Sequence, residues 1–95
     1  MQSAYAVIDR SGTVTTGGTA QQAAAANSGR RFLLLGNSNA TVDLWFRFAG
    51  TAAINGAGSF NVAPKTTLVF ADTLPSDTLS VISGTTAHAF TVLEI

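Results

Sequence analysis

The sequence predicts an all-β fold, either a single small antiparallel β-sandwich or a jelly-roll-like barrel, with about eight short strands. Threonine and glycine are abundant, with thirteen and nine copies, whereas proline occurs only twice, and this composition is typical of strands separated by turns. Short apolar or alternating runs recur near the spacing of about 8–12 residues found in sandwiches and barrels. The length of 95 residues supports one domain, which we expect to span residues 1–95.

The clearest strand pattern lies in residues 41–48, where apolar and mostly polar side chains alternate. Only a strand places alternate side chains on one face, so we expect Trp45 and Arg47 to face away from the core. The apolar members of this run are Val42, Leu44, Phe46 and Phe48. The other expected strands are residues 5–8, 13–16, 31–35, 59–62, 66–70, 78–82 and 88–95. Their expected inward-facing pairs are Leu68 with Phe70, Leu79 with Val81, and Phe90 with Val92.

Two segments admit two interpretations each. Residues 19–26 contain strong helix formers between capping residues, but so short a helix is marginal and its alanines have little to bury. We therefore expect this segment to be extended. Residues 1–10 form either an edge strand of the domain or an N-terminal arm that adds a strand to a neighbouring subunit.

The charge content excludes several classes of partner. The formal net charge is zero, and only 11% of residues are charged, compared with about 25% in an average globular domain. Nucleic-acid binding and electrostatic membrane anchoring both need a basic surface, so we expect neither partner. The first residues lack the pattern of a signal peptide, and no apolar run approaches the roughly 20 residues of a spanning helix. We expect a protein made in a cytoplasm.

No catalytic or metal-binding pattern stands out. The lone histidine, His88, is either a general base beside Asp72, Asp77 or Glu94 or a surface residue at the start of the last strand, and we expect the surface position. Residues 72–77 are the nearest candidate for a calcium loop, but their spacing matches none, so we expect a turn. The chain has no cysteine. We therefore expect no enzyme activity, no cofactor and no metal.

The low charge favours a subunit whose surface is covered in an assembly, because few ions lose hydration when such a surface is buried. If Phe32 and Leu34 fill the core, Leu33 and Leu35 face outward, and together with Trp45 they form a patch that needs a partner. Tryptophan and arginine are enriched at protein interfaces. The candidate interface residues are Trp45, Arg47, Leu33, Leu35, Arg30, Arg31 and Tyr5.

Four segments together resemble small structural proteins of tailed bacteriophages. They are Thr15–Gln22 (TTGGTAQQ), Asn27–Asn37 (NSGRRFLLLGN), Ala63–Phe70 (APKTTLVF) and Phe90–Glu94 (FTVLE). The resemblance implies a virion protein on the capsid surface, most often a capsid decoration (cement) protein. Such a protein would bind the major capsid protein or another virion protein, stabilise the head and form a homo-oligomer, for which we expect a trimer. Arg30, Arg31 and Arg47 would then pair with carboxylates of the shell.

Two other functions remain open at this point. One is a tail, head–tail connector or fibre subunit of the virion, which no sequence feature separates from a decoration protein. The other is a carbohydrate-binding module, in which Trp45 and Tyr5 would stack against sugar rings.

Overall fold

A computed structural model describes residues 5–95, which form nine strands in two packed antiparallel sheets. The predicted small all-β sandwich is therefore confirmed. The strands are β1 (Ile8–Asp9), β2 (Gly12–Thr13), β3 (Gln21–Ala24), β4 (Leu33–Asn37), β5 (Leu44–Phe48), β6 (Phe60–Val62), β7 (Thr66–Phe70), β8 (Leu79–Ile82) and β9 (Ala89–Glu94). Residues 5–95 contain no helix, and so none of a length and hydrophobicity that would cross a membrane.

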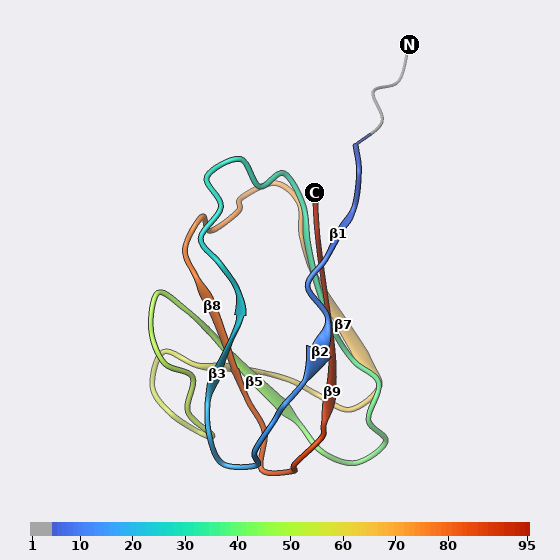
Figure 1. Cartoon of the computed structure of the whole chain (residues 1–95), viewed down its shortest axis with the longest axis vertical. Helices are drawn as coiled ribbons and strands as arrows, with labels where there is room; N and C mark the ends of the chain where they lie inside the picture. The colour runs from blue at the N-terminus through green and yellow to red at the C-terminus, as the bar shows by residue number, and fades with distance from the viewer. Residues whose placement is uncertain (1–4) are drawn as a thin grey trace.

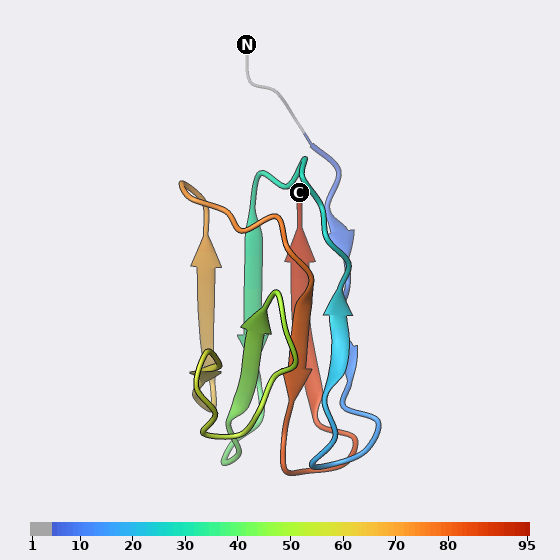
Figure 2. The same ribbon diagram turned by 90° about the vertical axis from the view of Figure 1, so that its left-hand side faces the viewer.

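The two sheets differ in size and in strand order. The five-stranded sheet has the order β1-β9-β4-β7, with β2 pairing with β9, and the four-stranded sheet has the order β3-β8-β5-β6. Figure 1 shows the sheets as two layers, and Figure 2 looks through the four-stranded sheet toward the five-stranded one. Among the described strands, only β5 and β6 are both paired and consecutive. The fold is therefore held together mainly by contacts between distant parts of the chain.

The core lies between the sheets and is made of alternate side chains from both. As the alternation in residues 41–48 predicts, Leu44 and Phe46 are fully buried, and Phe48 packs against the core at its edge. Phe48 and Phe60 stack with ring centroids 5.8 Å apart, and Phe70 meets Phe48 edge-on at 5.7 Å. Such aromatic pairs add stability beyond the area they bury. The other large side chains with no exposed surface include Leu33, Leu35, Val14, Leu79, Val81 and Val92.

The alanine-rich segment is extended, as expected. Gln21–Ala24 forms β3, which pairs with β8 and shifts register between Gln22 and Ala24. Ala23 and Ala24 are buried against the core. The small alanine side chains lie in the sandwich interior, and this burial together with the pairing to β8 outweighs their helix propensity.

The predicted orientation of Leu33 and Leu35 was wrong. Both side chains are completely buried, whereas Phe32 and Leu34 are only half-buried. The run from Phe32 to Leu35 is uniformly apolar, so it carries no alternation from which the inward face can be read. The register of β4 against β7 and β9 sets the orientation instead.

Leu68 also departs from the prediction. It pairs with Leu35 and so lies on the inner face of the sheet, but its side chain remains 37% exposed. The reason is its position, because among the described strands β7 is the last of its sheet and pairs on one side only.

The amino-terminal residues form part of the domain's own edge. Ile8 and Asp9 pair with Glu94 and Leu93 of β9, which agrees with the edge-strand interpretation for this pair. Residues 5–7 form no strand and are exposed. Residues 1–4, which belong to the predicted arm, lie outside the described residues.

Candidate functional site

One surface of the sandwich is apolar, and no segment of residues 5–95 lies across it. Leu34 pairs with Val69 on one side and with Leu93 on the other, so the three side chains lie on the same outer face of the five-stranded sheet. Phe32 and Ile95 exchange backbone hydrogen bonds of 3.3 and 3.0 Å and continue this face at one end. We call Phe32, Leu34, Val69, Leu93 and Ile95 the outer apolar face. Val69 is 51% exposed, and the other four are half-buried.

Polar and charged groups surround the outer apolar face without entering it. Asp9 pairs with Leu93 at one margin, and Arg31 precedes Phe32. At the other end, Gly36 leaves a shallow hollow of about 270 Å³ whose lining includes Lys65 and Thr91. An apolar centre with a polar rim is the usual composition of a protein–protein interface.

The opposite face of the sandwich is covered by the protein's own chain. The loop of residues 49–59 crosses the outside of the four-stranded sheet (Figures 1 and 2). The backbone N–H of Ala52 donates to Ser80 Oγ over 3.0 Å, and Ala52 is only 3% exposed. Ile82, on the same outer face, is likewise buried. The two outer faces therefore differ, because within residues 5–95 one has an intramolecular cover and the other has none.

Trp45 and Arg47 belong to the covered side. Trp45 pairs with Ile82 and Asn61 and is half-buried. The Arg47 guanidinium lies beside Gly50 and Gly58, close enough that a Cβ at Gly50 would come within 2.5 Å of Arg47 Nε. Arg47 thus packs beside the loop rather than standing free, whereas part of Trp45 stays accessible on this outer face. The interface role of this pair stays a prediction.

Arg30 is buried, contrary to its expected place on the surface. Its Nε donates to Glu94 Oε2 over 2.8 Å, and its side chain is 1% exposed. Its Nη1 donates to the backbone carbonyls of Pro75 and Asp77, and its Nη2 donates to the carbonyl of Ala25. One guanidinium therefore joins the end of β9 to two loops. It also hydrogen-bonds to carbonyls of residues 72–77, the segment considered as a calcium loop.

Glu94 is the centre of this buried charge cluster. Its side chain is fully buried, and Arg10 Nε donates to Oε1 over 3.1 Å. Burial raises the pKa of Glu94, but hydrogen bonds from Arg30 and Arg10, the charge of Arg30 and a hydrogen bond from Asn27 together hold it below its ordinary value. Glu94 is therefore ionised and paired, and it is no partner for His88.

His88 is buried as well, so its predicted surface position was wrong. Its Nε2 lies 2.9 Å from Asn37 Oδ1, and its Nδ1 lies 2.7 Å from Ser83 Oγ. The Asn37 amide donates to the carbonyls of Val42 and Val62, which turns Oδ1 toward the ring. The network thus assigns the proton to Nε2 and makes Nδ1 the acceptor from Ser83.

The Ser83–His88–Asn37 network places a hydroxyl beside an imidazole, as a Ser-His-Asp triad does, but it has an amide in place of the carboxylate and lacks access. Ser83 has no exposed surface, and His88 and Asn37 are each 2% exposed. No substrate can reach the Ser83 hydroxyl while the fold is closed. Burial lowers the pKa of His88, so the ring stays neutral and the network ties β4 to the turn between β8 and β9.

Arg31 and Tyr5 are brought together on the surface. The Arg31 guanidinium lies 4.5 Å from the centre of the Tyr5 ring, and its Nη1 donates to the Tyr5 hydroxyl over 3.2 Å. Tyr5 is 52% exposed. This pair lies next to Phe32, so these two predicted residues stand near the outer apolar face, whereas Trp45 does not.

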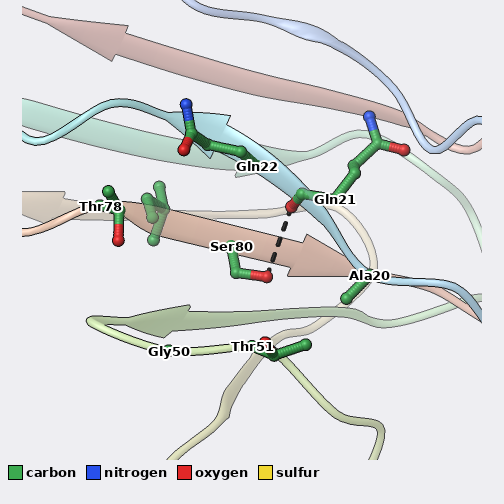
Figure 3. Close-up of a pocket in the computed structure, with 8 residues that line it drawn as sticks. Ala20, Gln21, Gln22, Gly50, Thr51, Thr78 and Ser80 are labelled. Atoms are coloured by element: carbon green, nitrogen blue, oxygen red, sulfur yellow. Dashed lines mark hydrogen bonds between the residues drawn. The ribbon is translucent and has the colours of Figure 1, made fainter.

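A second hollow, of about 200 Å³, lies between β3 and the loop of residues 49–59 (Figure 3). Ser80 Oγ donates to the Gln21 carbonyl over 3.4 Å at its base. Its lining comprises Ala20, Gln21, Gln22, Gly50, Thr51, Thr78, Leu79 and Ser80, without an acid, a base or an aromatic ring. Within residues 5–95, no three His, Asp or Glu side chains group together as a metal site would need.

Comparisons with protein-family models, with curated proteins and with solved structures find no match to this chain. The assignment of a function therefore depends on the surfaces and clusters described above.

Proposed function

We propose that this chain is a non-enzymatic structural protein of a virion, most simply a capsid decoration protein that binds the major capsid protein through its outer apolar face. The observation that carries the proposal is the contrast between the two sheets. The protein covers one outer face with its own loop and leaves exposed an apolar centre with charged groups only around it.

The composition of the outer apolar face suits a permanent contact. Covering it removes apolar surface from water and strips no ion of its hydration. Val69, its most exposed member, lies beside Leu34 at the centre. The charged rim of Asp9, Arg31 and Lys65 is available to orient a partner, and such rim charges contribute more to specificity than to affinity.

Support for the virion setting comes from the sequence. The order of segments from Thr15 to Glu94 resembles that of small structural proteins of tailed phages. A decoration protein is present in many copies, and each needs only one modest interface because neighbouring contacts on the shell act together. A small domain with zero formal net charge and one apolar outer face meets these needs.

The clustered titratable groups support a non-catalytic role. Glu94 and Arg30 are buried and paired with each other, and His88 is enclosed by Asn37 and Ser83. A general acid or base must reach a substrate, and these side chains are buried inside the fold.

The setting is tested by quantitative mass spectrometry of purified particles from the source, with the copy number expressed relative to the major shell protein. We expect hundreds of copies per particle. A few to a few dozen copies would refute the decoration role and indicate the tail or neck instead. Absence from particles would refute the virion assignment.

The surface is tested with Leu34→Lys and, as a matched control, Ile54→Lys. Leu34 lies at the centre of the outer apolar face, whereas Ile54 is 42% exposed on the loop that covers the other sheet. We expect the first variant to lose binding to particles that lack this protein and the control to bind normally, with both retaining cooperative thermal melts. Equal binding by the two variants would refute the proposed surface.

A further inference from the structure

The four sheet edges of the sandwich differ in how they are protected. β1 and β2 are each two residues long. Between them the backbone N–H of Val92 donates to the Ser11 hydroxyl over 3.0 Å instead of to a backbone carbonyl. β3 is interrupted by its register shift, and β6 has three residues. Short, broken strands are the usual means of preventing edge-to-edge association.

β7 lacks these protections. It runs in regular register over five residues, from Thr66 opposite Asn37 to Phe70 opposite Leu33. Its only strand partner among the described residues is β4, so alternate N–H and C=O groups along its other side point outward. The sequence Thr-Thr-Leu-Val-Phe contains no charge, no proline and no glycine. Figure 2 shows β7 at the open side of the five-stranded sheet.

The charged residues that flank β7 favour one orientation of a second strand paired with it. Lys65 precedes β7 and Asp72 follows it by two residues, and both are exposed. An antiparallel pair of two β7 strands brings Lys65 of each copy toward Asp72 of the other. A parallel pair would bring like charges together, so the charges favour antiparallel pairing.

We propose that two copies of this chain associate by antiparallel pairing of β7 with β7 across a two-fold axis, which joins their five-stranded sheets into one continuous sheet. This inference does not depend on the identity of the binding partner or on the virion role. Each copy has one β7 edge. Pairing occupies the β7 edge of both copies, so no third copy can add in the same way and the assembly stops at a dimer. It therefore differs from the trimer expected from the resemblance.

Symmetry limits the register of this pairing. The two-fold axis stands perpendicular to the sheet, so inward-facing residues must pair with inward-facing residues. The pair is then centred on a residue that lies opposite its own copy. Of the possible registers, those centred on Leu68 or Val69 use most of β7 and bring Lys65 close to Asp72 of the other copy. In both registers the two Val69 side chains are direct or diagonal neighbours, within roughly 5–8 Å.

The first experiment measures mass in solution for the full chain, Val69→Lys and the matched control Val7→Lys. Val69 and Val7 have similar exposed fractions, 51% and 57%, but only Val69 lies on β7. By sedimentation velocity and light scattering we expect about twice 9.7 kDa for the wild type and the control. Because the introduced lysines are neighbours in either register, we expect the dissociation constant of Val69→Lys to rise at least about tenfold.

The second experiment reverses the flanking charges. Lys65→Glu or Asp72→Lys alone places like charges together at both ends of the pair, and we expect each to weaken the dimer about threefold to thirtyfold. The double variant Lys65→Glu/Asp72→Lys restores both attractions, and we expect it to recover most of the affinity. Both positions are exposed, so the monomer fold should be retained.

Three outcomes would overturn the inference: a wild type that stays monomeric at every concentration, a dimer that Val69→Lys leaves intact, or a trimer. The particle-binding assay separates this failure from that of the proposed function. A monomeric wild type that still binds particles through Leu34 would refute β7 pairing alone. A β7 dimer that is absent from particles would refute the virion role alone.

Discussion

The buried ion pair between Arg30 and Glu94 yields the sharpest prediction about stability. Arg30→Met keeps the length of the side chain but removes its charge and all of its donors. Arg31→Met is the matched control, because this neighbouring arginine is exposed and its guanidinium hydrogen-bonds to and stacks on the exposed Tyr5.

The expected cost of Arg30→Met follows from what it leaves behind. Glu94 is fully buried and keeps only the partly exposed Arg10 and a 3.5 Å contact from Asn27. The carbonyls of Pro75 and Ala25 lose their charged donor. Removing one member of a buried pair costs about 3–5 kcal/mol. An exposed cation–π contact such as that of Arg31 contributes about 0.5–1 kcal/mol.

The assays are urea denaturation and a thermal melt of the two variants at one protein concentration, each followed by the emission of the single tryptophan. A domain of this length has a free energy of unfolding of about 5–14 kcal/mol, so Arg30→Met should remove a large share of it. We expect a thermal midpoint at least roughly 12 °C lower and a change of only a few degrees for Arg31→Met.

A double variant sets a further requirement. Arg30→Met/Glu94→Leu removes both charges, and we expect it to be more stable than Arg30→Met alone because no buried carboxylate lacks its partner. If Arg30→Met lowers the free energy of unfolding no more than Arg31→Met does, the account of this cluster as a buried, paired charge site is wrong. It is also wrong if the double variant is less stable than Arg30→Met.

The remaining predictions concern the core, the buried histidine and one close backbone contact. Phe46→Ala should cost about 3–5 kcal/mol and the exposed Ile54→Ala about 0.5 kcal/mol or less, and equal urea midpoints would refute the strand register. Because burial lowers the pKa of His88 in the folded state, the unfolded chain binds the proton first. The free energy of unfolding should therefore be highest above about pH 6.5 and should decrease as the pH falls below this value. A free energy of unfolding that stays constant between pH 7 and 5 would contradict the burial of His88. Gly17→Ala places a Cβ 2.6 Å from a backbone oxygen and should cost about 1–3 kcal/mol. The matched Gly29→Ala, whose nearest neighbour is 3.5 Å away, should be close to neutral in the same denaturation assay.

Strand pattern and fold class were readable from the sequence where polar and apolar residues alternate. Residues 41–48 show this alternation, and Leu44 and Phe46 are buried as it predicts. The extended state of Gln21–Ala24 followed from a similar local argument, since a short alanine helix has too little to bury. These inferences succeeded because the period of two belongs to a single strand and needs no partner.

The predicted outward patch of Leu33, Leu35 and Trp45 was wrong for the two leucines, which are buried. Phe32 to Leu35 are all apolar, so either pair was an equally good core on composition. The pairing of Leu34 with Val69 and Leu93 decided which side faced out. That register involves strands more than thirty residues away along the chain.

The tertiary structure alone decided which polar residues are buried. Arg30 meets Glu94 across 64 positions, and His88 meets Asn37 across 51, and nothing near either residue in sequence marks it as interior. A buried charge or ring is stable only beside a partner that satisfies it, and strand order brings the partners together. The sequence by itself determined the strands and much of the core, whereas the folded sheets determined the paired charges, the enclosed histidine and the uncovered face, because these depend on register between distant strands.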